Sequence, residues 1–270
     1  MTAYQSLRIT QQDKIACVEI NRPDKLNAMD AAFWTEMISA FEWVDATDEI
    51  RVVVVTGAGK HFSAGIDLAL LAQAAGRMSK DIGRNAEVIR GNILRLQASF
   101  NAVDRCRKPV IAAIQGYCLG GAIDLISACD MRYSTADARF GIKEIDMGMA
   151  ADVGTLQRLP HLIGDGIMRE LAYTGRLFDG REAQRIGLVN SVFDTHEQLV
   201  DHVMTLAREI ATKSPLAIRG TKEMIAYARD HSVEDGLNYI ASWNAAMLQS
   251  EDLKLAMEAH LAKRTADFAD

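Results

Sequence analysis

Cysteine is scarce in this sequence, and no pattern connects the cysteines that occur. The 270 residues include four, none in a Cys-x-x-Cys pair and each among apolar or small neighbours: Cys17, Cys106, Cys118 and Cys129. This usage argues against a disulfide framework and favours a reduced compartment. No apolar run is long enough to cross a bilayer, so we expect no membrane insertion. The first ten residues resemble neither a signal nor a transit peptide, and the last four match no retention or peroxisomal tag. We therefore expect a cytoplasmic location.

The chain also lacks an excess of positive charge. Its formal net charge is -6, and the lysines and arginines are scattered. This argues against a nucleic-acid groove or an anionic-membrane surface, so we expect no nucleic-acid partner. Hydrophobic residues make up 49% and charged residues 24%, the balance of a globular protein. The length suits one large domain or a domain with an appendage.

Motifs of several common enzyme classes are missing. The glycine-rich stretch GAGKHFSAG, residues 57–65, contains neither GxxxxGK[ST] nor a strict GxGxxG, so neither phosphate-loop fingerprint is met. The six histidines form no His-x-x-x-His pair, and no cysteine–histidine spacing indicates zinc, so we expect no metal. His61 and Ser63 lie close in sequence, but without a GxSxG elbow a serine hydrolase is not indicated.

Short apolar runs that alternate with helical segments indicate the fold class. KIACVEI (14–20) alternates like a strand, whereas RVVVVTG (51–57) and KPVIAAIQG (108–116) are continuously apolar, as in strands buried on both faces of a parallel sheet. DMRYSTA (130–136) is a weaker example. Residues 30–47 have helical spacing with Asp30 as a plausible N-cap. The alternation predicts βαβ units and hence an α/β core.

From about residue 196 the pattern changes to amphipathic helix, beginning with EQLVDHVMTLAREIATKS. The sequence therefore predicts an α/β core with the active site over residues 1–195 and a helical region over residues 196–270. That region could cover the core or pack against another subunit.

Two glycine-bearing turns follow predicted strands. HFSAGIDL (61–68) follows the strand at 51–57, and GYCLGGAIDLISACD (116–130) follows the strand at 108–116, with Gly120 and Gly121 where a helix should begin. A helix start exposes unpaired N–H groups, and glycine lets a ligand approach them closely. The turns are either ordinary tight turns or, if they converge, an oxyanion hole.

Three acidic residues follow at informative distances. Asp124 lies in the first turn of the helix expected at Gly121, where an acid also complements the helix dipole. Glu144 could belong to a solvated charge cluster in GIKEIDMG. Asp152 has the small or apolar neighbours of AADVG, where a carboxyl group is costly to bury unless it is paired or protonated. From the residues alone, Asp152 is equally well explained as a catalytic acid and as the N-cap of VGTLQRL.

These stretches together resemble the crotonase, or enoyl-CoA hydratase/isomerase, superfamily. The resemblance is carried by NRPDKLNAM (21–29), GKHFSAGIDL (59–68), the long stretch 108–164 and TGRLFDGREAQRIGLVNSVF (174–193). Within the superfamily, residues 143–160 and 228–253 resemble the dienoyl-CoA isomerase branch most. The resemblance implies an α/β fold, a crotonase-like spiral of repeated ββα units with a C-terminal helical trimerisation region. It also implies a homotrimer or hexamer.

The resemblance assigns roles residue by residue. The backbone N–H groups of Ile66 and Gly121 match the two oxyanion donors, and Asp124 and Glu144 match two acidic positions that hydratases fill with glutamate. Asp152 matches an additional acid of dienoyl isomerases. A methyl group at Ala122, where many relatives carry glycine, is a departure beside the oxyanion turn. Six further residues match segments that line the CoA pocket: Lys25, Leu26, Ala28, Ala64, Asp67 and Leu68.

The implied reaction converts 3,5-dienoyl-CoA to 2,4-dienoyl-CoA in fatty-acid β-oxidation. We expect Glu144 to remove a proton at C2, Asp152 to add one at C6, and Asp124 to orient the pair. Shielding by apolar neighbours should raise the pKa of Asp152 and keep it protonated. The acyl-CoA thioester is the substrate and CoA is part of it, so no cofactor is expected. Two rivals are an enoyl-CoA hydratase, which does not explain Asp152, and a non-catalytic acyl-CoA-binding scaffold, which has no use for three acids.

Overall fold

The structure is a computed structural model that describes residues 4–76 and 79–270. Its larger sheet has the strand order β1-β2-β3-β4-β6-β9, in which only the β1–β2 pair is antiparallel. The strands are β1 Leu7–Gln12, β2 Ile15–Ile20, β3 Val52–Gly57, β4 Val110–Ile114, β6 Met131–Thr135 and β9 Ser191–Phe193. The strands expected within residues 14–20, 51–57, 108–116 and 130–136 are confirmed as β2, β3, β4 and β6.

A smaller sheet gives the fold its spiral character. It contains β5 Tyr117–Leu119, β7 Arg139–Gly141 and β8 Phe178–Asp179, in the order β5-β7-β8. Strand β5 directly follows β4, β7 follows β6, and β8 precedes β9, so three successive strands of the larger sheet each have a sequence neighbour in the smaller one. The α/β spiral expected from the sequence is confirmed.

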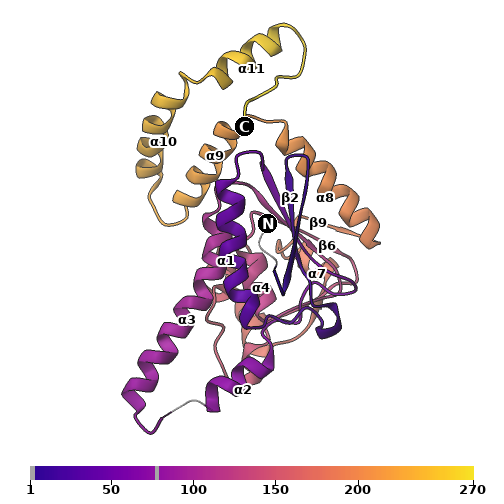
Figure 1. The fold of residues 1–270 in the computed structure, drawn as a ribbon, viewed down its shortest axis with the longest axis vertical. Helices are drawn as coiled ribbons and strands as arrows, with labels where there is room; N and C mark the ends of the chain where they lie inside the picture. The colour runs from indigo at the N-terminus through magenta and orange to yellow at the C-terminus, as the bar shows by residue number, and fades with distance from the viewer. Residues whose placement is uncertain (1–3, 77–78) are drawn as a thin grey trace.

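The continuous apolar runs of β3 and β4 are buried on both faces of the larger sheet. Val53 and Val55 belong to the main hydrophobic core, whereas Val52 and Val54 belong to a second cluster that includes Leu199 of helix α8. Helices α1 (Ala31–Ala46) and α3 (Ile82–Arg105) lie on one side of the sheet and α8 (His196–Ala211) lies on the other (Figure 1). A parallel strand between two helical layers needs apolar side chains on both faces, which explains these runs.

Local signals in the sequence set the ends of several helices. Asp30 caps α1 as expected, since its Oδ1 accepts a hydrogen bond from Phe33 N at 3.0 Å. Helix α4 begins at Gly121, also as expected. The remaining core helices and 3-10 turns are η1 Pro23–Lys25, α2 Leu68–Gly76, α4 Gly121–Ser127, η2 Glu144–Met147, α5 Thr155–Arg158, η3 Leu159–His161, α6 Asp165–Thr174 and α7 Gly180–Arg185.

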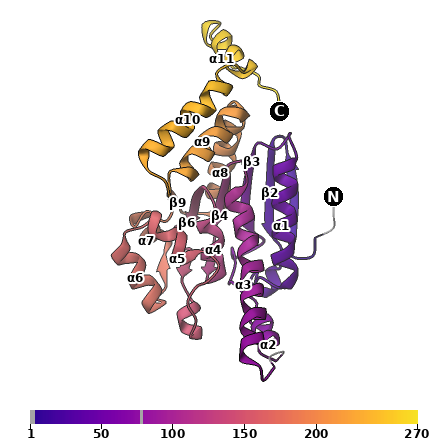
Figure 2. The same ribbon diagram turned by 90° about the vertical axis from the view of Figure 1, so that its left-hand side faces the viewer.

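The C-terminal region is helical, as predicted, but its helices do two different things. Helix α8 covers the sheet, while α9 (Pro215–Tyr227), α10 (Val233–Met247) and α11 (Glu251–Leu261) extend away from it (Figure 2). The described residues of α10 include none that is buried. The division after residue 195 stays a prediction. Among the described helices, none has the length and apolar character needed to span a membrane.

Candidate active site

The two glycine turns converge, so that two backbone amides lie close together. Gly65 has φ +87°, and a Cβ atom there would lie 3.1 Å from Gly121 N and 2.5 Å from Leu119 O. A Cβ atom on Gly121 would lie 3.7 Å from Ile66 N. Only glycine at residue 65 allows this approach without strain.

Neither the Ile66 amide nor the Gly121 amide is used by the fold. Within residues 4–76 and 79–270, neither N–H donates a hydrogen bond to the chain, and Gly121 is the first residue of α4, where no helical acceptor exists. The backbone around Ile66 is nevertheless fixed, since Met29 N donates to Gly65 O at 2.8 Å and Asp67 N donates to Met29 O at 3.0 Å. The geometry is that of a pre-organised pair of donors for one oxygen atom. The Ala122 methyl group, expected as a departure beside this turn, packs in the hydrophobic core.

Asp124 is the most deeply buried of the three acids. It is 1% exposed, and its Oδ1 accepts a hydrogen bond from Thr155 N at 2.6 Å, whereas Oδ2 has no hydrogen-bond partner among the described residues. Burial raises the pKa of Asp124 to about 6; the hydrogen bond from Thr155 and the charge of Arg158 oppose this rise, and the charge of Asp152 adds to it.

Glu144 lies directly over the glycine turn. A Cβ atom on Gly120 would lie 3.3 Å from Glu144 Oε1, and Glu144 Oε2 is buried with no hydrogen-bond partner among the described residues. Burial raises the pKa of Glu144 to about 7, with further contributions from the charges of Asp124 and Asp152. A carboxyl group that titrates near neutral pH suits a general base.

The expectation of a shielded Asp152 is wrong for the described chain. Ala151, Val153 and Gly154 are buried, but Asp152 is exposed between them. Partial burial still raises the pKa of Asp152, in the predicted direction, and its charge acts on both Asp124 and Glu144. The capping alternative for Asp152 is also wrong. The N-cap of α5 is Gly154, with no side-chain hydrogen bond.

The six residues expected at the CoA pocket come together as two neighbouring segments. Ala64 N donates to Leu26 O at 3.0 Å, which joins residues 25–29 to residues 64–68. Leu26 is 44% exposed and Leu68 is 58% exposed, so apolar surface remains open there. Asp67 is engaged by Arg22 at 3.1 Å, and the Ala69 N–H and Arg22 lower its pKa. Asp67 therefore has a structural partner. Lys25 and Ala28 lie on the segment that this hydrogen bond pairs with Ala64.

Sequence reasoning missed two residues that shape the site. Thr155 supplies the N–H that binds Asp124, and its only sequence signal is a polar residue within the apolar stretch VGTLQ. Asn27 is fully buried, and its Nδ2 donates to Ala58 O at 2.9 Å and His61 O at 2.7 Å. It thereby joins the loop of residues 21–29 to the segment that leads into the first glycine turn.

Comparison with known proteins agrees with this geometry. The sequence profile of the enoyl-CoA hydratase/isomerase family matches residues 10–270. The chain belongs to the enoyl-CoA hydratase/isomerase family. This family member is 47% identical, over 95% of its own length and 79% of the relative's, to a protein from Homo sapiens named "Delta(3,5)-Delta(2,4)-dienoyl-CoA isomerase, mitochondrial". It is 46% identical to the peroxisomal protein of that name from Arabidopsis thaliana, over 100% of this chain and 99% of the relative.

Solved structures of the family confirm the fold. An enoyl-CoA hydratase from Bacillus anthracis superposes with a TM-score of 0.89 at 30% identity, covering 98% of this chain and 99% of the other. The compartments named for the sequence relatives are the mitochondrion and the peroxisome, so the cytoplasmic location of this family member stays a prediction.

Proposed function

We propose that this protein is an isomerase that converts 3,5-dienoyl-CoA to 2,4-dienoyl-CoA in fatty-acid β-oxidation. The observation that carries the proposal is the grouping of three acids, Asp124, Glu144 and Asp152, around two unused amides, with the pKa of each acid raised. A hydratase needs only two carboxyl groups around one water molecule. The names of the relatives at 45% to 47% identity support the same activity.

The first step is removal of a proton from C2 of the substrate. In this proposal the thioester oxygen accepts hydrogen bonds from the N–H groups of Ile66 and Gly121, and the C2–H bonding electrons move toward that oxygen as Glu144 takes the proton. The result is a dienolate. Removing one such amide donor typically costs about 3 kcal/mol of transition-state stabilisation.

The second step is protonation of the dienolate at C6 by Asp152. Electrons return from the oxygen to form the C2=C3 and C4=C5 double bonds, and C6 takes the proton. An acyl chain between Glu144 and Asp152 would exclude water from Asp152 and favour its protonated form. Asp124, held by Thr155 N, would orient the pair. Carboxyl groups supply both proton transfers and CoA is part of the substrate, so the proposal includes neither a cofactor nor a metal.

The direct test is the appearance of the 2,4-dienoyl-CoA chromophore when purified protein meets 3,5-dienoyl-CoA. We expect rapid turnover of this substrate and slow or no hydration of a 2-enoyl-CoA of equal length. Faster hydration of 2-enoyl-CoA than isomerisation would identify a hydratase instead. Tight binding of both thioesters without turnover would identify an acyl-CoA-binding scaffold.

The pH dependence of kcat/KM tests the protonation states. As the base, Glu144 must be ionised, and burial raises its pKa to about 7, so activity should fall as the pH drops below this value. As the acid, Asp152 must be protonated, so activity should also fall at high pH, which gives a bell-shaped profile. Activity that rose steadily as the pH fell from about 7 to about 5 would exclude an ionised Glu144 as the base.

Substitution of Gly65 tests the paired amides. In Gly65→Ala the new Cβ atom would lie 2.5 Å from Leu119 O and 3.1 Å from Gly121 N, at a backbone φ of +87°. We expect kcat to fall by about 10²- to 10³-fold, the usual effect of losing an oxyanion donor. The matched control is Gly91→Ala on α3, where a Cβ atom meets nothing within 4 Å, and it should keep full activity. Wild-type kcat in a folded Gly65→Ala protein would contradict the oxyanion assignment.

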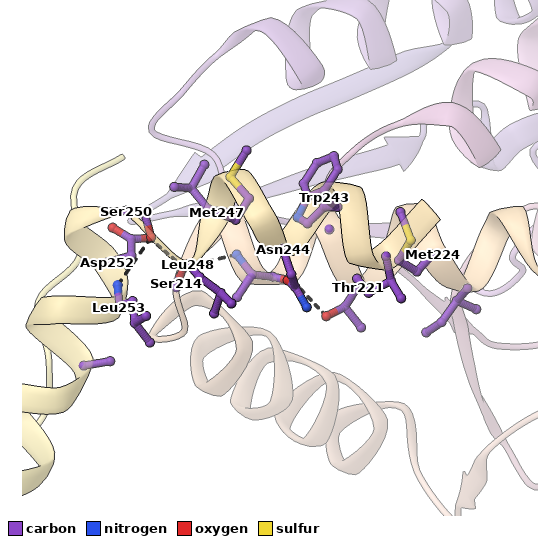
Figure 3. A pocket seen from close by; sticks show the side chains of 16 residues that line it. Ser214, Thr221, Met224, Trp243, Asn244, Met247, Leu248, Ser250, Asp252 and Leu253 are labelled. Atoms are coloured by element: carbon purple, nitrogen blue, oxygen red, sulfur yellow. Dashed lines mark hydrogen bonds between the residues drawn. The ribbon is translucent and has the colours of Figure 1, made fainter. Parts of the chain in front are cut away.

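We also propose that copies of this chain assemble into a trimer or a hexamer. Helix α10 exposes Val233 (81%) and Leu237 (64%), a costly arrangement for a helix left in water. Between α9, α10 and α11 lies a groove of about 460 Å³, lined by Trp243, Met224 and Met247 among others (Figure 3). A second copy of the chain would cover these apolar surfaces. Sedimentation equilibrium should give three or six times the 29.7 kDa chain mass, whereas a monomer at micromolar concentration would contradict the assembly.

A further inference from the structure

Arg158 is the last residue of α5. Its side chain contacts both the loop before that helix and helix α3. Its guanidinium Nη2 donates to Asn101 Oδ1 at 2.7 Å, its Nε lies 3.5 Å from Asp104 Oδ2, and its Nη1 donates to Val153 O at 3.5 Å. The Arg158 side chain is only 13% exposed. A guanidinium with several fixed partners on two elements is a rigid connection between them.

The loop is shaped to admit this guanidinium. Gly154 has φ +136°, a conformation that residues with a side chain rarely adopt, and a Cβ atom there would collide with Arg158 Nη1. A second side chain of α3 holds the same loop, because Gln97 Nε2 donates to Asp152 O at 2.7 Å. The loop backbone is thus held at two carbonyl oxygens: Gln97 of α3 binds that of Asp152, and Arg158, itself bound to α3, contacts that of Val153.

This loop carries two parts of the proposed machinery. Asp152 is the proposed acid, and the Thr155 N–H donates to Asp124 at 2.6 Å. Asp152 precedes α5, and Thr155 is only the first residue of that four-residue helix, which has no side-chain cap. A displacement of about 1 Å in a catalytic group can cost about 100-fold in rate, so whatever fixes the loop affects turnover.

We propose that Arg158 is a positioning residue of this enzyme: its guanidinium, bound to α3, fixes the loop that presents Asp152 and the Thr155 N–H to the reaction. The proposal rests on the proposed function of these two groups. Arg158 touches neither the reacting atoms nor the thioester. Its charge has a second effect, since it lowers the pKa of Asp124 against the effects of burial and of the Asp152 charge. Glu144 is the remaining acid that faces Asp124.

The experiment compares Arg158→Gln and Arg158→Lys with the wild type and with a control, Arg169→Gln. Among the described residues, Arg169 pairs only with Asp165 and Tyr173 of its own helix, and its side chain is 59% exposed, so its loss should leave activity unchanged. For Arg158→Gln we expect kcat to fall by about 10- to 100-fold with KM within about threefold. The pKa of Asp124 should rise, because Asp124 loses a neighbouring cation, and ¹³C NMR of the labelled carboxyl group measures this rise. Lysine keeps the charge and should restore the pKa of Asp124 while restoring kcat only in part.

Hydrogen–deuterium exchange keeps this proposal separate from the proposed function. In Arg158→Gln, the peptide that contains Thr155 should exchange at least about tenfold faster than in the wild type, whether or not the protein isomerises dienoyl-CoA. If the wild type had no isomerase activity but gave this exchange result, the proposed function would be overturned and the positioning role of Arg158 would stand. Unchanged exchange in a folded Arg158→Gln protein would overturn the positioning role. A loss of kcat that only follows the loss of folded protein, with the pKa of Asp124 unchanged, would overturn it as well.

Discussion

Replacing Glu144 by glutamine is expected to lower kcat by about 10²- to 10⁴-fold, the usual range for the loss of a general base. Glutamine has the same shape but cannot take the C2 proton. The Oε2 atom of Glu144 has no hydrogen-bond partner among the described residues, so the substitution breaks no bond at that atom and the fold should survive. Turnover is followed by formation of the 2,4-dienoyl-CoA chromophore. Exchange of the C2 hydrogens with D₂O, followed by NMR, isolates the first step.

The C2 exchange decides the role of Glu144. In Glu144→Gln the exchange should disappear together with turnover, because no dienolate forms. The matched control is Glu197→Gln at the exposed start of α8, which removes the same charge far from the acids and should behave as the wild type. Exchange that continued at the wild-type rate in Glu144→Gln would show that another group removes the C2 proton.

Replacing Asp152 by asparagine is expected to lower kcat by about 10²- to 10⁴-fold as well, but with a different isotopic result. The dienolate should still form and return its proton to C2, so the C2 hydrogens of recovered substrate should exchange with D₂O while product formation stops. Asparagine keeps the size of the side chain, and the hydrogen bond from Gln97 goes to the backbone of residue 152, so it remains available.

The control for this variant is Asp194→Asn. Asp194 is an exposed acid that pairs with Arg181 on the surface, with a side chain 78% exposed. It should retain wild-type kcat. Near-normal turnover in Asp152→Asn would remove Asp152 as the acid, and loss of C2 exchange in that variant would place Asp152 in the first step instead.

Local patterns were sufficient to predict strands β2, β3, β4 and β6 and the start of α4. The continuous apolar runs at 51–57 and 108–116 indicate strands buried on both faces, and the structure places a helical layer on each side of β3 and β4. Gly121 was expected at a helix start because glycine precedes a helical spacing of apolar residues, and α4 begins there. These features depend on neighbours in sequence, which a pattern can show.

The environment of Asp152 could not be predicted in the same way. Its neighbours Ala151 and Val153 are buried, but the side chain between them points outward and is exposed. Composition around a residue shows how apolar the segment is and not which way one side chain points. The carboxyl groups of Asp124 and Glu144, rather than that of Asp152, have the driest surroundings, and this depends on contacts with distant segments.

Long-range contacts also explain the residues that the sequence did not reveal. Thr155 lies 31 residues from Asp124, and Arg158 lies 57 residues from Asn101, yet each pair is joined by a hydrogen bond. No periodicity or spacing connects such positions, because the spiral brings together segments from different turns. The roles of these residues became visible only with the hydrogen bonds themselves.

The central claim is that two different carboxyl groups carry out the two proton transfers. Its most direct test uses 3,5-dienoyl-CoA with both C2 hydrogens replaced by deuterium, and the wild-type protein in ordinary water. Glu144 should release the C2 deuteron to solvent and Asp152 should deliver a solvent proton, so the product should contain deuterium at C2 and only protium at C6. Product with deuterium at C6 would mean that one group carries the same hydrogen along the chain, which would contradict the two-residue account.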